Sequence, residues 1–502
     1  MRRLIIGCAA LVLSGMASAT DLVGVYQDAL KYDPAIRQAD ATRKAQREAN
    51  PQAWAALLPQ INGNYSYARQ KIDQTTAFPI EGPGGQVIVA PESVTQFTDS
   101  HGYQLQLTQS VFSWANWATL LRAHKQVAQA EADYHAAEED LIQRVSTAYF
   151  NVLNAQDNLD AQSASLEALS RSLDQANKRF EVGLIAITDV KEAQATHDAT
   201  AAQVIVAKRQ LASMQRALRE ITDQDYPALA KPSDKMPLQT PLPADPNRWV
   251  DVSMDQNLAL LSARLAADVA RDTVRIQQAG HLPTLGITGT RSKSNTDNDQ
   301  QFDLFGQVTR FPYPGASDNS QISLQVNVPI FSGGLVSSQA RQAQFNWIAA
   351  KEHMAAVTRS TEHLARDSYS GVITGVAQVA ALRQGLESAQ VALRATEAGY
   401  EVGTRTEVEV LTSRQNLVQA QTNYAQALYS YIESIIELRL AAGNLDRHAL
   451  EQINGWLDVS QPLPASPESV PTPGAPVQPG QSAGAAPPPG TLPQQLPEPK
   501  SR

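Results

Sequence analysis

Residues 400–411 read YEVGTRTEVEVL, and residues 180–191 read FEVGLIAITDVK. Both segments carry an aromatic residue, Glu, Val and Gly in the same order, followed by a stretch that contains Thr. In each segment the glycine, Gly183 or Gly403, interrupts a helical pattern that resumes after it. The recurrence predicts that the chain contains two helical hairpins of one design, whose turns lie 220 residues apart.

Two other pairs of segments repeat with a similar offset. LPQINGNYSY (58–67) corresponds to LPTLGITGTR (282–291), and LQLTQSVFSW (105–114) corresponds to LQVNVPIFSG (324–333). An internal repeat of this size indicates a duplicated structural unit. The sequence therefore predicts five parts: a signal peptide (1–19), a first repeat (20–224), a Pro-rich linker (225–248), a second repeat (249–459) and a disordered Pro-rich tail (460–502).

The N-terminal segment MRRLIIGCAALVLSGMASA has a basic start, an apolar stretch and a small-residue end, which is typical of a cleaved secretory signal. The single cysteine, Cys8, lies inside it, so no disulfide, catalytic thiol or Cys-ligated metal is expected in the mature chain. The chain has 41 Lys and Arg against 50 Asp and Glu, a net charge of −9, and loss of Arg2 and Arg3 makes it −11. This acidic balance argues against nucleic acid as a partner.

Four segments alternate apolar and polar residues with a period of two. They are marked by Ile61, Tyr65 and Tyr67, by Tyr103, Leu105 and Leu107, by Leu285 and Ile287, and by Ile322, Leu324, Val326, Val328 and Ile330. Strands of about 9–11 residues with this alternation are typical of a transmembrane sheet, and the edge of a soluble β-sandwich is the alternative. The polar segments 69–102 and 291–320 are predicted to form loops outside the cell.

Each repeat also predicts a very long helix. Apolar residues recur with 4-3 spacing from Leu141 to Phe180, which is typical of a coiled-coil seam. The pattern predicts a helix over 114–180, 67 residues or roughly 100 Å long at about 1.5 Å per residue. It resumes at Val190 and recurs in the second repeat up to Tyr400.

Four strands in one chain are too few to close a membrane barrel, because the smallest such barrels have about eight. An open sheet edge in lipid would leave backbone groups unpaired at a cost of several kcal/mol each. Several copies of the chain must therefore assemble. The predicted fold class is mixed: four transmembrane β-barrel strands per chain continue into a long α-helical coiled-coil barrel, with two tandem repeats per chain.

In this order of parts, and in the motifs GLIAITDV (183–190), YEVGTRT (400–406) and LRLAAGNL (438–445), the chain resembles the TolC family of outer-membrane channel tunnels, in the branch used for type I secretion and multidrug efflux. The resemblance implies a homotrimer with a twelve-stranded barrel in the outer-membrane lipid of a Gram-negative cell and a helical tunnel in the periplasm. It also implies an exit duct for proteins or small toxic compounds. The duct would be served by an inner-membrane ABC or proton-driven transporter and by a periplasmic adaptor that contacts the turns at Gly183 and Gly403.

The resemblance further implies a gate at the periplasmic helical tip. Tyr400 and Arg405 of one turn are expected to bond with Thr188 and Asp189 of the other, which would hold neighbouring hairpins together at the closed end. An exposed Arg–Asp pair contributes only about 0–1 kcal/mol. A lock repeated in three symmetric copies would therefore remain weak enough for a partner protein to open.

The family often has two acidic residues after the arginine of this lock. Glu409 supplies the first and is expected to form an acidic ring in the pore, whereas Thr412 stands at the second position and leaves cation selectivity open. The same turns also fit simple helix capping. The segments 406–409 (TEVE) and 189–192 (DVKE) both have the pattern of a capping box.

The sequence contains no HExxH, Walker, GxSxG or paired-cysteine motif, so no enzyme activity, cofactor or metal site is expected. The alternative to a channel is a periplasmic coiled-coil scaffold or adaptor without a pore. The four alternating segments argue against this alternative, because an adaptor of that kind has no use for membrane-length strands.

Overall fold

A computed structural model describes residues 19–458, except residues 82, 234–235 and 305–306. The predicted tail (460–502) and all but the last residue of the predicted signal peptide (1–19) lie outside the described residues.

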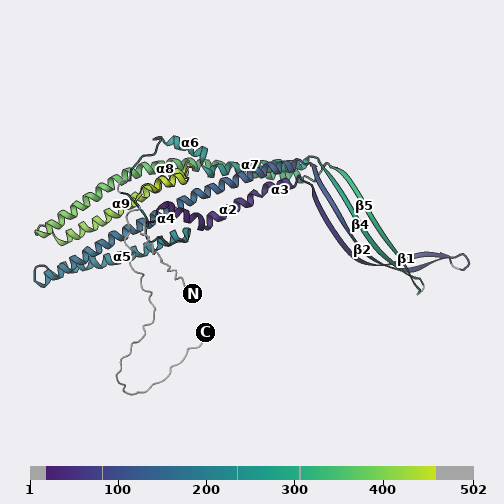
Figure 1. Ribbon diagram of the computed structural model, residues 1–502, viewed down its shortest axis with the longest axis horizontal. Coiled ribbons are helices and arrows are strands. Elements are labelled where there is room, and N and C mark those ends of the chain that lie inside the picture. Colours follow the sequence, from purple (N-terminus) through teal and green to yellow (C-terminus); the bar gives the residue numbers. More distant parts are fainter. Residues whose placement is uncertain (1–18, 82, 234–235, 305–306, 459–502) are drawn as a thin grey trace, which may run out of the picture. The chain divides into compact units, whose positions relative to one another are not determined.

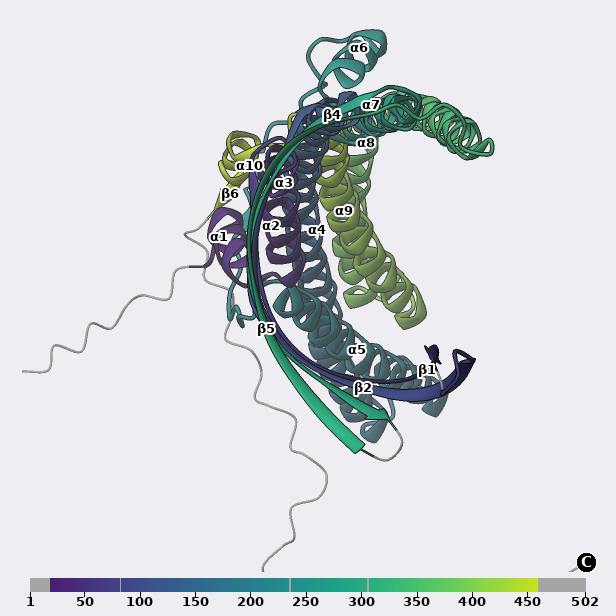
Figure 2. The ribbon, with the colours of Figure 1, turned by 90° about the vertical axis from the view of Figure 1, so that its right-hand side faces the viewer.

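Four long strands form one antiparallel sheet in the order β1-β2-β4-β5. The strands are β1 (Gln60–Glu81), β2 (Val87–Phe112), β4 (Thr284–Leu304) and β5 (Gln307–Asn327). Each repeat contributes one hairpin, and the two hairpins meet where β2 pairs with β4. The strands lie side by side in Figure 1 and follow a common curve in Figure 2. The sheet therefore combines both halves of the duplicated sequence.

The register places the predicted apolar residues that lie within the four strands on one face of the sheet. Val328 and Ile330, which were also predicted to alternate in a strand, lie beyond the end of β5 at Asn327. Ile61 lies opposite Leu107, and Ile287 lies opposite Leu324. These side chains are not covered in the single chain, since 70% of the Ile61 surface and 66% of the Leu324 surface are exposed. Such an exposed apolar face indicates contact with an apolar phase.

The strands are 21 to 26 residues long, which is about twice the predicted length. The prediction that 69–102 and 291–320 form loops is therefore wrong, because most of both segments belongs to strands. Backbone pairing continues in register even where both faces carry polar residues, and no side-chain alternation marks it. Cross-strand ion pairs also join the polar part, as between Arg69 Nε and Asp99 Oδ1 at 2.6 Å.

Four helices form two long hairpins, α4 (Trp114–Glu181) with α5 (Ile187–Thr222), and α8 (Leu335–Glu401) with α9 (Glu407–Ala441). The predicted helix over 114–180 is confirmed and ends one residue later. Ser113 caps its first turn by accepting a hydrogen bond from the Asn116 N–H at 3.3 Å. The predicted seam is largely buried in this helix, as at Leu141, Val145 and Leu159.

Shorter elements pack against the long helices. They are α1 (Leu22–Tyr32), α2 (Pro34–Arg47), α3 (Ala49–Ala55), β3 (Lys231–Pro232), α6 (Pro246–Gln256), α7 (Leu258–Gln278), η1 (Ala279–His281), α10 (Arg447–Asn454) and β6 (Leu457–Asp458). Helices α2 and α3 contact α4, whereas α6 and α7 contact α8. Helix α7 also contacts α4 and thereby joins the two repeats. Among the described helices, none is both long and apolar enough to cross a membrane.

The Pro-rich segment between the repeats is fixed to both of them. The Tyr149 hydroxyl on α4 donates to the Ala230 carbonyl at 2.8 Å. The Tyr431 hydroxyl on α9 donates to the Gln239 carbonyl at 2.9 Å. Strand β3 pairs with β6 near the end of the second repeat. The segment between the repeats therefore acts as a bound strap across helices of both hairpins.

Candidate functional site

The two hairpin turns have the same backbone structure where α4 and α8 end. Gly183 has φ +77° and Gly403 has φ +76°, in the left-handed region that favours glycine. The Gly183 N–H donates to the Phe180 carbonyl at 2.9 Å, and the Gly403 N–H donates to the Tyr400 carbonyl at 3.0 Å. The repeated sequence motif therefore encodes a repeated helix ending.

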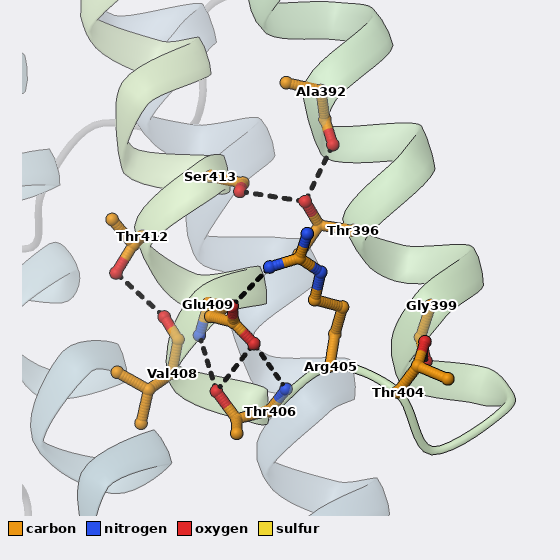
Figure 3. Close-up of polar contacts among 10 residues, drawn as sticks. All are labelled: Ala392, Thr396, Gly399, Thr404, Arg405, Thr406, Val408, Glu409, Thr412 and Ser413. Carbon is orange, nitrogen blue, oxygen red and sulfur yellow. Dashed lines mark hydrogen bonds and ion pairs between the residues drawn. The ribbon is translucent and has the colours of Figure 1, made fainter.

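The turns differ where the returning helices begin. At the start of α9, the Thr406 Oγ1 accepts from the Glu409 N–H at 3.3 Å, and the Glu409 Oε2 accepts from the Thr406 N–H at 2.8 Å (Figure 3). Arg405 Nη1 donates to the other oxygen of Glu409 at 2.7 Å. The Thr406 N–H and then the Arg405 guanidinium lower the pKa of Glu409. The predicted capping box at 406–409 is confirmed.

Helix α5 begins without a side-chain cap. Its N-cap residue is Ala186, and Asp189 lies at the third position inside the helix. The predicted capping box at 189–192 is therefore wrong, because the helix starts three residues earlier than a cap at Asp189 requires. The Thr188 hydroxyl instead donates to Asp189 Oδ1 at 3.4 Å. The Thr188 side chain is exposed at the tip of the hairpin, and Asp189 is half-buried.

Tyr400 joins the two hairpins through residues that the sequence analysis missed. Arg179 Nη1 on α4 donates to Tyr400 Oη at 3.0 Å, and Tyr400 Oη donates to Glu407 Oε2 at 3.1 Å. The Ser172 hydroxyl, also on α4, donates to Glu407 Oε1 at 3.1 Å. Burial and then the Glu407 charge raise the pKa of Tyr400. One signal was present in the sequence: a base in the last turn of α4 and an acid in the first turn of α9 are favoured by the helix dipoles.

The structure brings only some of the predicted gate residues together. Arg405 pairs with Glu409, which was assigned a separate role as a pore ring. Within the part of the chain that the structure describes, no hydrogen bond joins Tyr400 or Arg405 to Thr188 or Asp189. The lock between the two turns therefore stays a prediction, because a single chain does not contain the hairpins of a neighbouring copy.

Other polar contacts near the tip hold α8 and α9 to each other. Thr396 Oγ1 lies 3.2 Å from Ser413 Oγ, and Arg414 Nη2 donates to Glu397 Oε1 at 2.6 Å. The Thr412 hydroxyl donates to the Val408 carbonyl of its own helix at 2.8 Å (Figure 3). Thr412, which stands where the family often has a second acidic residue, thus forms a hydrogen bond within its own helix.

A profile of the outer membrane efflux protein family matches residues 25–223 and 249–444, one match in each repeat. The chain belongs to this family. The outer membrane efflux protein fold is also found in the CmeC outer membrane channel of Campylobacter jejuni, with a TM-score of 0.67 and 20% identity over 88% of this chain and 90% of CmeC.

Two relatives of this outer membrane efflux protein are similar over nearly their whole length. The outer membrane protein TolC of Vibrio cholerae is 34% identical over 449 residues, which cover 89% of this chain and 96% of the relative. The alkaline protease secretion protein AprF of Pseudomonas aeruginosa is 26% identical over 90% of this chain and 91% of the relative. The protein is an outer-membrane efflux or secretion channel of two tandem repeats, with its helical tunnel in the periplasm. Its relatives are transport channels rather than enzymes, and a scaffold without a pore is not favoured.

Proposed function

We propose that three copies of this chain form an exit duct that carries proteins or small toxic compounds across the periplasm and the outer membrane. The observation that carries this proposal is the open sheet. Among the described strands, β1 pairs only with β2, and β5 pairs only with β4, so both edges offer unpaired backbone groups over more than twenty residues. Edges of this length are costly in lipid unless another chain pairs with them. Three four-stranded sheets would close into one cylinder of twelve strands.

We propose that an inner-membrane ABC or proton-driven transporter delivers the cargo and that a periplasmic adaptor contacts the hairpin turns. Apolar side chains flank both turn glycines and are largely exposed, with exposed fractions of 73% for Leu184 and 75% for Val402. Exposed apolar residues at a tip fit the surface of a partner protein. The name of AprF, an alkaline protease secretion protein, supports protein cargo, and the family description supports efflux.

The proposed gate consists of Thr188 and Asp189 in one hairpin and Tyr400 and Arg405 in the other. Arg405 uses one nitrogen to bind Glu409, and a guanidinium has five N–H donors, so it retains donors for a second acceptor. The half-buried Asp189 carboxylate is such an acceptor. Glu409 would at the same time place a carboxylate ring at the entrance, where it would favour cations.

The repeat boundaries are part of the proposal. A first repeat over 20–224 and a second repeat over 249–459, with the strap 225–248 between them, are supported by the two family matches, which cover residues 25–223 and 249–444.

Substitution of Arg405 tests the gate. Single-channel recordings in planar bilayers are expected to show a higher conductance for Arg405→Ser than for the unsubstituted protein, because the bonds between turns are lost. The matched control is Ile185→Ser, at the equivalent position of the first turn, where no bond is removed and no rise is expected. An unchanged conductance of Arg405→Ser would contradict the gate assignment.

A further inference from the structure

The hydroxyl group of Tyr400 has one proton to donate, and in this structure the proton is directed to Glu407. Tyr400 Oη lies 3.1 Å from Glu407 Oε2. A phenol carries a single O–H, and a carboxylate can only accept. Within the proposed lock, a bond from Tyr400 to the carboxylate of Asp189 would need the same proton. Tyr400 cannot donate to both carboxylates at once, so the two bonds exclude each other.

Glu407 is held in place by the first hairpin. Its second oxygen accepts from the Ser172 hydroxyl at 3.1 Å, and Arg179 on the same helix donates to Tyr400 Oη at 3.0 Å. The Arg179 guanidinium carbon also lies 5.1 Å from the centre of the Tyr400 ring. Two points on α4 therefore support both members of the Tyr400–Glu407 pair.

The surroundings of this pair favour a strong bond. A hydrogen bond to a charged acceptor is about twice as strong as a neutral one. The pair lines a cleft of about 370 Å³ that also contains Arg179 and Ser172. The Tyr400 hydroxyl is protonated at neutral pH and can donate, because burial and then the Glu407 charge raise its pKa above an ordinary value of 10.0.

We propose that Glu407 competes with Asp189 for the Tyr400 hydroxyl and stabilises the released arrangement of the gate. Ser172 and Arg179 are positioning residues in this scheme, since they act through Glu407 and Tyr400. The inference rests on the proposed gate at the helical tip. It assigns to Glu407 a role in opening the gate, whereas the bonds proposed for the four gate residues all favour closure.

Single-channel recording of the assembled protein tests the competition. Glu407→Ala is expected to lower the ratio of open to closed channels by about tenfold for each chain, the change in an equilibrium constant that corresponds to about 1.4 kcal/mol. The fall is easiest to measure in the Arg405→Ser background, where conductance is expected to be high. Glu407→Gln, which keeps the shape of the side chain, is expected to give a smaller fall in the same direction.

Two further variants separate competition from a general effect on the tip. In a Tyr400→Phe background, Glu407→Ala is expected to have no effect, because the contested proton is absent. Glu401→Ala removes a carboxylate from the same cleft that does not bond to Tyr400 in the described structure, and it is expected to leave the open fraction unchanged.

The outcomes distinguish this inference from the gate itself. The competition is rejected if Glu407→Ala raises the open fraction, or if it lowers the open fraction in the Tyr400→Phe background as well. In both cases the proposed gate stands as long as Arg405→Ser raises the conductance. If Arg405→Ser leaves conductance unchanged, the proposed gate is rejected and the competition with it.

Discussion

The two helical turns of the chain share one sequence motif and one helix ending, but they begin their second helices differently. Gly183 and Gly403 adopt nearly the same backbone angle and the same hydrogen bond back to the preceding helix. Helix α9 then begins with a reciprocal capping box, whereas α5 begins at Ala186 with no side-chain cap.

The two turns therefore differ in the groups that their side chains bind. In the second turn, Thr406, Glu409 and Arg405 bind one another, so this turn is organised within its own chain. In the first turn, Thr188 is exposed and Asp189 is half-buried, and the hydrogen bond between their side chains is long, at 3.4 Å. The two turns thus share one helix ending, but only the second turn begins its returning helix with side-chain bonds.

The shared helix ending predicts equal costs when either glycine is replaced. Gly183→Ala and Gly403→Ala are each expected to weaken the local structure by about 1–2 kcal/mol, because an L-residue is strained in the left-handed region. No heavy atom lies within 4 Å of a Cβ added at either position, so the backbone angle alone sets the cost. Hydrogen-exchange protection in the last turns of α4 and α8 measures it. Clearly unequal costs would mean that the two endings are not equivalent.

The different helix starts predict opposite effects of exchanging the caps. Thr406→Ala is expected to destabilise the first turn of α9 by about 1 kcal/mol, because the Glu409 N–H loses its acceptor. Ala186→Thr is expected to stabilise the first turn of α5 by about 0.5–1 kcal/mol, because it adds the missing cap. Exchange protection of the first-turn amides reports both changes. A gain for Ala186→Thr without a loss for Thr406→Ala would contradict the contrast between the turns.

Acidification is expected to reduce the difference in stability between the first turns of α9 and α5, by less than the cap substitutions do. The pKa of Glu409 is lowered from its usual value of 4.5, so its stabilising contacts are present above that pH and are lost as the pH falls through the lowered value. Protection factors in the first turn of α9 should therefore fall at acidic pH. Glu409→Gln should remove this pH dependence, and its persistence in that variant would assign it to another group.

The helical part of the fold was accessible from the sequence, whereas the full extent of the sheet was not. The seam from Leu141 to Phe180 repeats over many turns, so its spacing located α4 to within one residue at its C-terminal end. The strands over 69–102 and 291–320 carry polar residues on both faces, and backbone pairing there leaves no alternating pattern. The packing of the strap likewise depends on tertiary contacts, such as Tyr149 with Ala230.

The candidate site was also only partly predictable. The motif at 406–409 specified its own capping box, because all of its partners lie within one turn of helix. The contacts of Tyr400 with Arg179 and of Glu407 with Ser172 join residues more than two hundred positions apart, and no local spacing encodes them. The start of α5 was misplaced because Asp189 and Glu192 matched a pattern that the backbone does not use.

The central claim is that several copies of this chain pool their strands and helices to enclose one conduit. Native mass spectrometry of the particle extracted from outer membranes in detergent counts the chains directly. Our account predicts three chains in each particle. A single chain per particle that stays monodisperse in water after the detergent is removed would contradict it.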